Sequence, residues 1–538
     1  MLNIAHKLSE VASKYGEKTG LVEVRSGRTL SFDELDSLSQ QYASYLHSQG
    51  VRAGKRVMLM VKPSADFICL TFALFRIGAP VILIDPGMGY KNLLKCIAGV
   101  KPNYLIGIPQ VLLFKMIFRR TFHTVEKSFS CGKIFGIPGT DIRENARSPL
   151  SHQPVFQADN DSLAAIIFTT GSTGPPKGVR FEHSIFSAQL KYIKDYYQIG
   201  PDDVDQPGFP LFGLFSIALG ACAVIPDMDP SRPASVDPEK FMASILKYQV
   251  TYSFGSPAIW NVVSNYCIEK AIRSSHLKKV LMAGAPVPGE LIKRVYSLME
   301  KDGKIFTPYG ATESLPIVSI EGTEILNETW AKTRKGKGTC VGRPLPGIDV
   351  KVVAATSDRL LSIDQCTELP DNSIGEIIVK GDVVTSTYEN NQPETDLSKI
   401  TDKEGFWHRI GDVGYFDDSK RLWFCGRKAH RVNTQNGIMD TIPCESIINE
   451  HPCVFRSALV GIDSGDGYEI PAMIVELIKE RDRSNDVVLQ EIRQLAEKHK
   501  NTRDIKHYLV HTSFPVDIRH NAKIFREKLK VWAEKKLA

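Results

Sequence analysis

The sequence predicts an α/β protein: a large N-terminal domain of layered, mixed or parallel β-sheets and helices, then a small, mobile α+β C-terminal domain. The first observation is a series of short apolar runs separated by helix-like segments: RVMLMV, PVILID, YLIGI, AAIIF, KKVLMAG and GEIIVKG. Such runs are typical of parallel strands in α/β layers. The second is the length of 538 residues, which predicts two or three compact units with large cores. The third is a change to polar, turn-rich and then charge-dense sequence after Cys425.

This change in composition also divides the chain. We expect a hinge near residues 427–429, so that residues 1–426 form the large domain and residues 427–538 the small one. A last helix from about Lys523 would place Phe525, Leu529 and Trp532 on one stripe. That pattern is expected of an amphipathic helix docked on a core.

The composition excludes several classes of protein. With 43% hydrophobic and 24% charged residues the chain is globular, neither disordered nor fibrous. A net charge of +6 is small for this length, so we expect no nucleic-acid partner. The ten cysteines are scattered without CxxC pairs, which argues against a zinc site or a disulfide framework. The N-terminal segment lacks the apolar core of a signal peptide, and we expect a cytoplasmic protein.

A loop rich in glycine, serine and threonine is the first candidate for a functional site. The stretch FTTGSTGPPKGV at residues 168–179 follows the apolar run SLAAIIF, which predicts a buried strand. Glycines allow the positive φ values of a concave turn whose N–H groups converge on an anion, and hydroxyls and a lysine add donors suited to phosphate. The candidate residues are Thr169, Thr170, Gly171, Ser172, Thr173, Gly174, Lys177 and Gly178. A polar surface loop is the alternative, but the preceding strand favours phosphate binding.

This loop is not a Walker loop. The pattern GxxxxGK[ST] requires glycine where Pro176 stands, and serine or threonine where Gly178 follows Lys177. The ten residues TTGSTGPPKG instead resemble the phosphate loop of the acyl-adenylate-forming, or AMP-binding, superfamily, which includes acyl-CoA synthetases, peptide-synthetase adenylation domains and luciferases. The resemblance implies an adenylation domain over residues 1–426 and a mobile lid over residues 427–538.

A second motif follows in the order that this superfamily has. The stretch LMAGAPVPGEL places Gly284, Ala285 and Pro286 directly after a predicted strand. A tight backbone at this point can lie against a flat base, and the resemblance implies that this base is adenine.

A third motif, TPYGATES at residues 307–314, carries several functional groups. The resemblance implies that Tyr309 stacks on adenine beside Gly310. It also implies that Thr312 donates to the α-phosphate and that Glu313 holds a magnesium ion.

Three further residues complete the implied site. Asp412 in HRIGDVGYFD is suited to accept hydrogen bonds from both ribose hydroxyls, and Arg427 in FCGRKAH would close the ribose from the hinge side. Lys523 in RHNAKIFREKL lies where the superfamily keeps a lysine that bridges the acyl carboxylate and the α-phosphate.

The implied activity is ATP-dependent adenylation of a fatty carboxylic acid, with ATP as substrate and Mg²⁺ as cofactor. Mg²⁺ and Lys177 would stabilise charge on the departing pyrophosphate, while Lys523 and Thr312 would stabilise the pentavalent phosphorus. No protein nucleophile is needed, because positioning and electrostatics carry the reaction.

The sequence departs from the superfamily at positions that concern the second half-reaction. Ala429 replaces the usual Asp or Lys, Gly213 replaces a gating His or aromatic residue, and NTQNGIMD lacks the Gly-Gly that many CoA ligases use. The C-terminal loop PVDIRHNAKIFR is longer and contains His520 and Asn521. These changes leave adenylation intact and affect thioester formation.

Two unusual stretches, IDPGMGYKNLLKCI and DIRHNAKIFREKL, resemble the β-lactone synthetases of bacterial long-chain olefin biosynthesis. The resemblance implies a 2-alkyl-3-hydroxy fatty acid as substrate, whose own hydroxyl displaces AMP to form a β-lactone. His520 is a candidate base for the hydroxyl proton, and a surface histidine is the alternative. Other enzymes of olefin formation are implied partners.

Two other functions stay open. A medium- or long-chain fatty acyl-CoA or acyl-carrier ligase shares the same adenylation core and would use CoA. A non-catalytic binder of acyl groups or nucleotides is disfavoured because Lys177, Glu313, Asp412 and Lys523 are all in place.

Two apolar stretches have uncertain surroundings. Residues 210–226, PLFGLFSIALGACAVIP, are at the short limit for a transmembrane span, and we expect a buried helix or strand. The stretch VLLFKMIFRRTF at residues 111–122 mixes apolar residues with three cations. It could make weak contact with a membrane surface, cover an acyl pocket, or pack on the core with its basic side chains reaching solvent.

Overall fold

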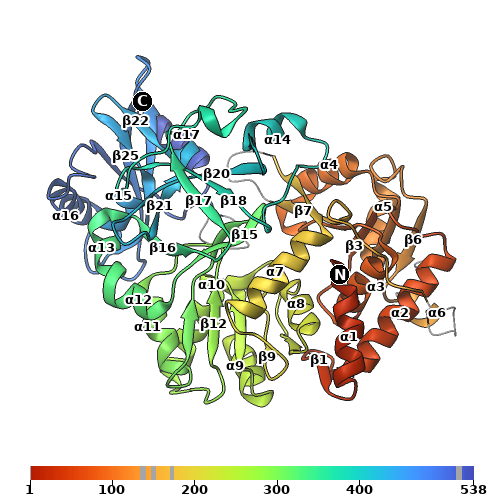
Figure 1. The fold of residues 1–538 in the computed structure, drawn as a ribbon. Coiled ribbons are helices and arrows are strands. Elements are labelled where there is room, and N and C mark those ends of the chain that lie inside the picture. The colour runs from red at the N-terminus through yellow and green to blue at the C-terminus, as the bar shows by residue number, and fades with distance from the viewer. Residues whose placement is uncertain (1, 134–140, 147–152, 170–174, 517–523, 538) are drawn as a thin grey trace.

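The computed structural model describes residues 2–133, 141–146, 153–169, 175–516 and 524–537. Two large sheets with three layers of helices form the N-terminal part, an antiparallel sheet lies beside them, and a smaller sheet forms the C-terminal part (Figure 1). This α/β architecture confirms the predicted fold class.

A six-stranded sheet carries the phosphate-loop strand. Its strand order is β6-β5-β3-β4-β7-β8, with parallel pairing except between β7 and β8. The bounds are β3 Val57–Met60, β4 Val81–Leu83, β5 Tyr104–Gly107, β6 Lys127–Ser130, β7 Leu163–Thr169 and β8 Lys177–Glu182. Four of the predicted apolar runs are thus confirmed as parallel strands.

A seven-stranded sheet has the order β13-β12-β11-β9-β10-β1-β2 and is parallel except between β1 and β2. The bounds are β1 Thr19–Glu23, β2 Arg28–Ser31, β9 Val204–Asp205, β10 Cys222–Ile225, β11 Tyr252–Gly255, β12 Lys279–Met282 and β13 Lys304–Phe306. The run KKVLMAG is therefore also a parallel strand, as predicted.

One set of helices fills the space between the two sheets, and its apolar residues share one core with both of them. This set comprises α1 Ala5–Tyr15, α2 Phe32–Ser48, α3 Ala65–Ile77, α6 Ile142–Asn145, α7 His183–Asp195 and α8 Phe212–Ala218. Local sequence fixes several ends: Ser31 and Glu34 form a capping box at the start of α2, and α3 ends at Gly78 with φ 78°.

Two further sets of helices cover the outer faces. α4 Tyr90–Val100 and α5 Pro109–Ile117 pack on the six-stranded sheet, and α9 Pro238–Lys247, α10 Pro257–Glu269 and α11 Gly289–Leu298 pack on the seven-stranded sheet. Residues 210–226 contain α8 and β10, which are largely buried, as expected. Among the residues that the structure describes, no helix combines the length and apolar character needed to cross a membrane.

The third sheet corrects one expectation. The run GEIIVKG forms β18, which is antiparallel to both of its neighbours, although apolar runs of this kind predict parallel strands. The strand is buried on both faces. A continuous apolar run indicates such burial, but it does not distinguish a parallel from an antiparallel strand.

The third sheet has the order β14-β15-β16-β21-β20-β18-β17, with β19 paired to β20. Its bounds are β14 Tyr309–Ala311, β15 Ser314–Ser319, β16 Thr339–Pro344, β17 Asp349–Val353, β18 Gly375–Lys380, β19 Lys399–Asp402, β20 Gly405–Phe416 and β21 Leu422–Arg427. The short helices α12 Gly322–Glu324, α13 Trp330–Lys332 and α14 Gln392–Ser398 lie in its connections.

The C-terminal part begins where β21 ends, at Arg427. It contains β22 Val432–Thr434, β23 Gly437–Met439, α15 Thr441–Ile448, β24 Val454–Asp463, β25 Glu469–Leu477, α16 Asn485–Glu497, β26 His507–Val510 and α17 Arg526–Leu537. In α17, Leu529 and Ala533 are buried and Trp532 packs on the same core, whereas Phe525 precedes the helix. The division into domains at residue 427 stays a prediction.

Candidate active site

One cavity of about 2030 Å³ joins the three large sheets and reaches the C-terminal part. Ordinary small-molecule pockets measure about 300–1,000 Å³, so this one has room for more than one ligand. Most of the predicted site residues line it: Lys177, Gly284, Ala285, Pro286, Tyr309, Gly310, Thr312, Glu313, Asp412 and Arg427. Residues more than 200 positions apart in the sequence therefore meet at one place.

Lys177 begins β8, opposite Thr169 at the end of β7. Its Nζ forms an ion pair with Glu394 of α14 and lies 5.4 Å from the ring centroid of Tyr388. The predicted phosphate-binding residues Thr170, Gly171, Ser172, Thr173 and Gly174 lie outside the described residues. Lys177 is thus held at the cavity wall by the carboxylate of Glu394.

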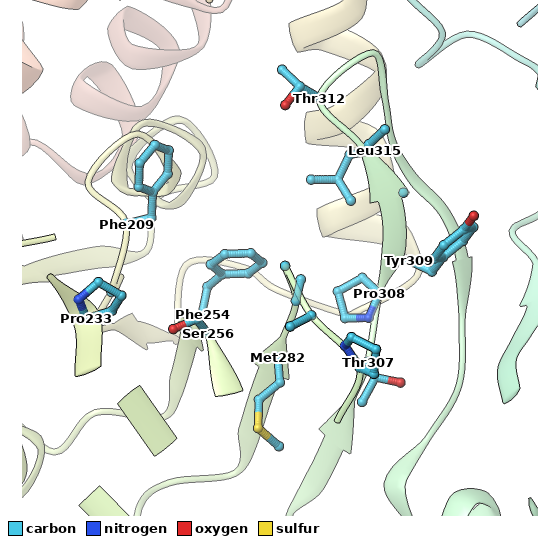
Figure 2. Close-up of a pocket in the computed structure, with 18 of the residues that line it drawn as sticks. Phe209, Pro233, Phe254, Ser256, Met282, Thr307, Pro308, Tyr309, Thr312 and Leu315 are labelled. Atoms are coloured by element: carbon cyan, nitrogen blue, oxygen red, sulfur yellow. The ribbon is translucent and has the colours of Figure 1, made fainter. Parts of the chain in front are cut away.

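Thr312 and Glu313 are the two residues of the tight turn between β14 and β15. Gly310 needs its small size, because a Cβ there would lie 2.3 Å from the carbonyl oxygen of Ser314. The hydroxyl of Tyr388 donates to Glu313 Oε1 at 2.7 Å. The turn therefore presents a hydroxyl and an oriented carboxylate side by side, and Thr312 lies at the edge of the cavity in Figure 2.

Asp412, Tyr309 and Arg427 come together from three strands. The hydroxyl of Tyr309 donates to Asp412 Oδ2 at 2.7 Å, and Arg427 Nε lies 3.1 Å from Asp412 Oδ1. The Asp412 carboxylate raises the pKa of Arg427, and burial raises the pKa of Tyr309. Arg427 Nη1 also donates to the carbonyl of Ile410. These contacts fix the orientation of the Asp412 carboxylate in the cavity wall.

The turn after β12 supplies backbone to the same cavity. Gly284 has φ 98°, a conformation that glycine adopts without steric cost. Ala285 and Pro286 follow it along the wall. Because Gly284 has no side chain, a ligand in the cavity could approach this backbone closely.

Sequence reasoning missed two residues that contact the predicted ones and a third that interacts electrostatically with Glu313. Tyr388 orients Glu313, and Glu394 pairs with Lys177. Lys399 donates to the carbonyl of Thr385, and burial lowers its pKa to about 7 despite the charges of Glu313 and Glu182. The first two belong to TYENNQPET, whose single tyrosine and acidic residues give no signal without the fold.

Apolar side chains form two walls of the remaining cavity. One wall comes from the six-stranded sheet and includes Leu59, Leu83, Ile167 and Phe181. The other comes from the seven-stranded sheet and α8 and includes Phe209, Phe212, Phe254 and Met282. Figure 2 shows Phe209 and Phe254 across the cavity from Leu315 and Tyr309. The rings of Phe212 and Phe254 stack with their centroids 3.8 Å apart.

The segment 111–122 has two environments. Val111 lines the cavity, and Leu112 and Phe122 are buried. Leu113, Met116 and Ile117 are exposed. The segment therefore packs on the core with one face and leaves an apolar face outside.

Lys523, His520 and Asn521 lie outside the described residues, so their expected roles stay predictions. The roles assigned to the other site residues also stay predictions, although the structure brings those residues together. Chemically, the arrangement combines a lysine cation, a hydroxyl and two oriented carboxylates with apolar walls. Such a site can bind a nucleotide beside an apolar acid.

Comparison with known proteins agrees with this geometry. The model of the AMP-binding enzyme family matches residues 8–389. An olefin beta-lactone synthetase from Stenotrophomonas maltophilia (strain K279a) is 39% identical over 516 residues, covering 95% of this chain and 92% of that protein.

Two solved structures share the fold. The anthranilate CoA ligase AuaEII in complex with anthranoyl-AMP superposes with a TM-score of 0.81 at 18% identity, covering 99% of this chain and 98% of the other. O-succinylbenzoate coenzyme A synthetase (MenE) from Bacillus subtilis, in complex with ATP and magnesium ion, superposes with a TM-score of 0.77 at 19% identity. This superposition covers 97% of this chain and 99% of the other. The chain belongs to the AMP-binding enzyme family and is an acyl-adenylate-forming ligase.

Proposed function

We propose that the enzyme converts a 2-alkyl-3-hydroxy fatty acid and ATP into a β-lactone, AMP and pyrophosphate. The observation that carries the proposal is the 39% identity, over 95% of this chain, to a protein named olefin beta-lactone synthetase. A match that covers 95% of the chain extends into the C-terminal part, where acceptor chemistry differs among adenylate-forming enzymes.

The two apolar walls support a substrate with two alkyl chains. They come from different sheets and line the same cavity as the turn that carries Thr312 and Glu313. A 2-alkyl-3-hydroxy acid has one chain on C2 and another on C3, and both must leave water when the carboxylate reaches this turn. Apolar burial favours that placement by about 0.8 kcal/mol for each CH₂ group.

In the first half-reaction, a carboxylate oxygen of the substrate attacks the α-phosphorus of ATP and pyrophosphate leaves. Asp412 would hold the ribose hydroxyls with Arg427 beside it, and Thr312 would donate to the α-phosphate. Lys177 would exchange Glu394 for phosphate oxygens, and Lys523 would bridge the carboxylate and the α-phosphate. Such preorganised donors stabilise charge that develops in the transition state.

Mg²⁺ fits the donors present at this site. It commonly binds one or two carboxylates together with substrate phosphates and water, and Glu313 is a carboxylate oriented at the cavity wall by Tyr388. When bound, Mg²⁺ would neutralise charge on the phosphates.

In the second half-reaction, the 3-hydroxyl oxygen attacks the acyl carbon, AMP leaves with its bridging oxygen, and the hydroxyl proton passes to a base. The ring closes within one molecule, and well-oriented intramolecular reactions reach effective molarities of about 10⁵–10⁸ M. His520 is the proposed base. No CoA is consumed.

Partner enzymes of an olefin pathway, weak membrane contact and a cytoplasmic location are further proposals, and lactone formation needs none of them.

The main proposal is tested with a 2-alkyl-3-hydroxy fatty acid, ATP and Mg²⁺ in the absence of CoA. We expect a lipid product that has lost one water, formed in equal amount to AMP. The 3-deoxy analogue should support ATP–pyrophosphate exchange and give no lactone. A product that forms only with CoA, and is a thioester, would establish an acyl-CoA ligase.

A further inference from the structure

We propose that the outer face of helices α4 and α5 docks on an anionic lipid bilayer. We define this α4–α5 face by its exposed residues: Tyr90, Lys91, Lys95, Leu113, Met116, Ile117, Arg119 and Arg120. The apolar residues would enter the interface, and the cations would bind lipid phosphates and carboxylates.

The charge of this region is unlike that of the rest of the chain. Residues 86–125 contain six cations and no Asp or Glu: Lys91, Lys95, Lys101, Lys115, Arg119 and Arg120. The whole chain has a formal net charge of +6, so the remaining residues are neutral in sum. Residues 86–125 alone therefore carry a formal charge equal to that of the whole chain.

These cations are available to an external anion. Within the described part of the chain, no ion pair holds Lys91, Lys95, Arg119 or Arg120. Lys115 differs, because it is half-buried and its Nζ donates to Ser128 Oγ at 2.7 Å. The four exposed cations thus offer charge complementarity to a surface of anionic headgroups, where each is attracted over about a Debye length.

Exposed apolar side chains lie beside these cations. Leu113, Met116 and Ile117 are 46%, 48% and 68% exposed, and their spacing places them on one face of α5. Packing of Phe114 against Phe118 and Phe122, with ring centroids 4.6 and 6.2 Å apart, holds the helix on the sheet. An apolar face flanked by cations is typical of helices that lie in a membrane interface.

The position of α5 connects this face with the cavity. Ile108 and Val111, at the start of the helix, line the cavity that holds the proposed acyl site. Figure 1 shows α4 and α5 together on the outer side of the six-stranded sheet. A lipid acid that leaves a docked bilayer would therefore reach the proposed acyl site close to the point where it leaves the membrane. This last step rests on the proposed function, whereas docking does not.

Docking is tested by flotation of the purified full-length protein, without substrate, with vesicles of phosphatidylcholine alone or with 30% phosphatidylglycerol. We expect flotation with the anionic vesicles only, and release in 1 M salt. Each cation near such a surface contributes about a fivefold factor in partitioning, so Arg119→Glu/Arg120→Glu should lower partitioning at least about 30-fold. Leu113→Ser/Ile117→Ser should also abolish flotation.

Matched variants at other exposed sites serve as controls. Lys535→Glu/Lys536→Glu makes the same charge change on α17, and Ile268→Ser removes an equally exposed apolar side chain, 51% exposed, from α10. Both should float like wild type, and thermal unfolding should show that all variants are folded. Equal flotation of the α5 variants and wild type, or no flotation of wild type, would overturn the proposal. If the wild-type protein self-associates without binding vesicles, and Leu113→Ser/Ile117→Ser loses this self-association, the α4–α5 face binds a second copy of the chain. That result would also overturn the proposal.

Discussion

Replacement of Asp412 by Asn tests the proposed ribose site. The carboxylate is 5% exposed and contacts the Tyr309 hydroxyl at 2.7 Å and Arg427 Nε at 3.1 Å. Asparagine keeps the shape and removes the charge. A hydrogen bond to a charged group contributes about 1.5–3 kcal/mol and a neutral one about 0.5–1.5 kcal/mol, so weakening two bonds to ribose hydroxyls costs about 2–3 kcal/mol. At 1.36 kcal/mol for each factor of ten, kcat/KM for ATP should fall about 30- to 200-fold.

The assay is ATP–pyrophosphate exchange at saturating acid substrate, with ATP varied. Asp417→Asn is the control, because Asp417 also pairs with an arginine, Arg421 Nε at 2.9 Å, and follows the same strand. The control should keep kcat/KM for ATP within about threefold of wild type, and unfolding curves should show both variants folded. A folded Asp412→Asn enzyme with wild-type kcat/KM for ATP would refute the assignment of the ribose site.

Three further variants test other contacts. Tyr388→Phe removes the 2.7 Å bond to Glu313 and should raise the Mg²⁺ concentration needed for half-maximal exchange about tenfold or more; an unchanged Mg²⁺ titration would contradict the role of Tyr388. Glu376→Ala leaves Arg409 and Lys428, which contact its carboxylate at 2.7 and 2.8 Å, without their buried partner. It should lower the free energy of unfolding by about 3–5 kcal/mol, whereas Glu368→Ala at an exposed pair should leave the denaturation midpoint nearly unchanged. Burial raises the pKa of Asp205 from 3.8 to about 8, so the native state keeps a proton that the unfolded chain releases, and stability falls as pH rises from 4 to 8. The free energy of unfolding of Asp205→Asn, relative to that of wild type, should therefore increase by about 4 kcal/mol between pH 5 and 8. A pH-independent difference between the two proteins would contradict this protonation state.

The residues expected to bind the nucleotide could be identified because each lies in a short local sequence pattern. Glycine at a positive-φ turn, a lysine after a strand and a carboxylate in a tight turn each leave a short pattern. Their order along the chain is that of the superfamily, and this resemblance implied that Lys177, Glu313 and Asp412 meet. The structure confirms the meeting of these residues in one cavity.

Other features depend on packing between distant segments and leave no such pattern. Tyr388 and Glu394 act through contacts with Glu313 and Lys177 that only the folded sheet arrangement creates. The direction of β18 could not be predicted either, since burial on both faces gives the same apolar run in parallel and antiparallel sheets. The two apolar walls of the cavity are likewise assembled from separate sheets.

The central claim is that the carboxylate is adenylated and the 3-hydroxyl oxygen then closes the ring. Its most direct test uses a 2-alkyl-3-hydroxy fatty acid with ¹⁸O in the hydroxyl group, ATP and Mg²⁺, followed by mass spectrometry of the lactone and AMP. Our account predicts full retention of ¹⁸O in the lactone and unlabelled AMP. Transfer of ¹⁸O to AMP would show that the hydroxyl is activated instead, and would contradict the mechanism.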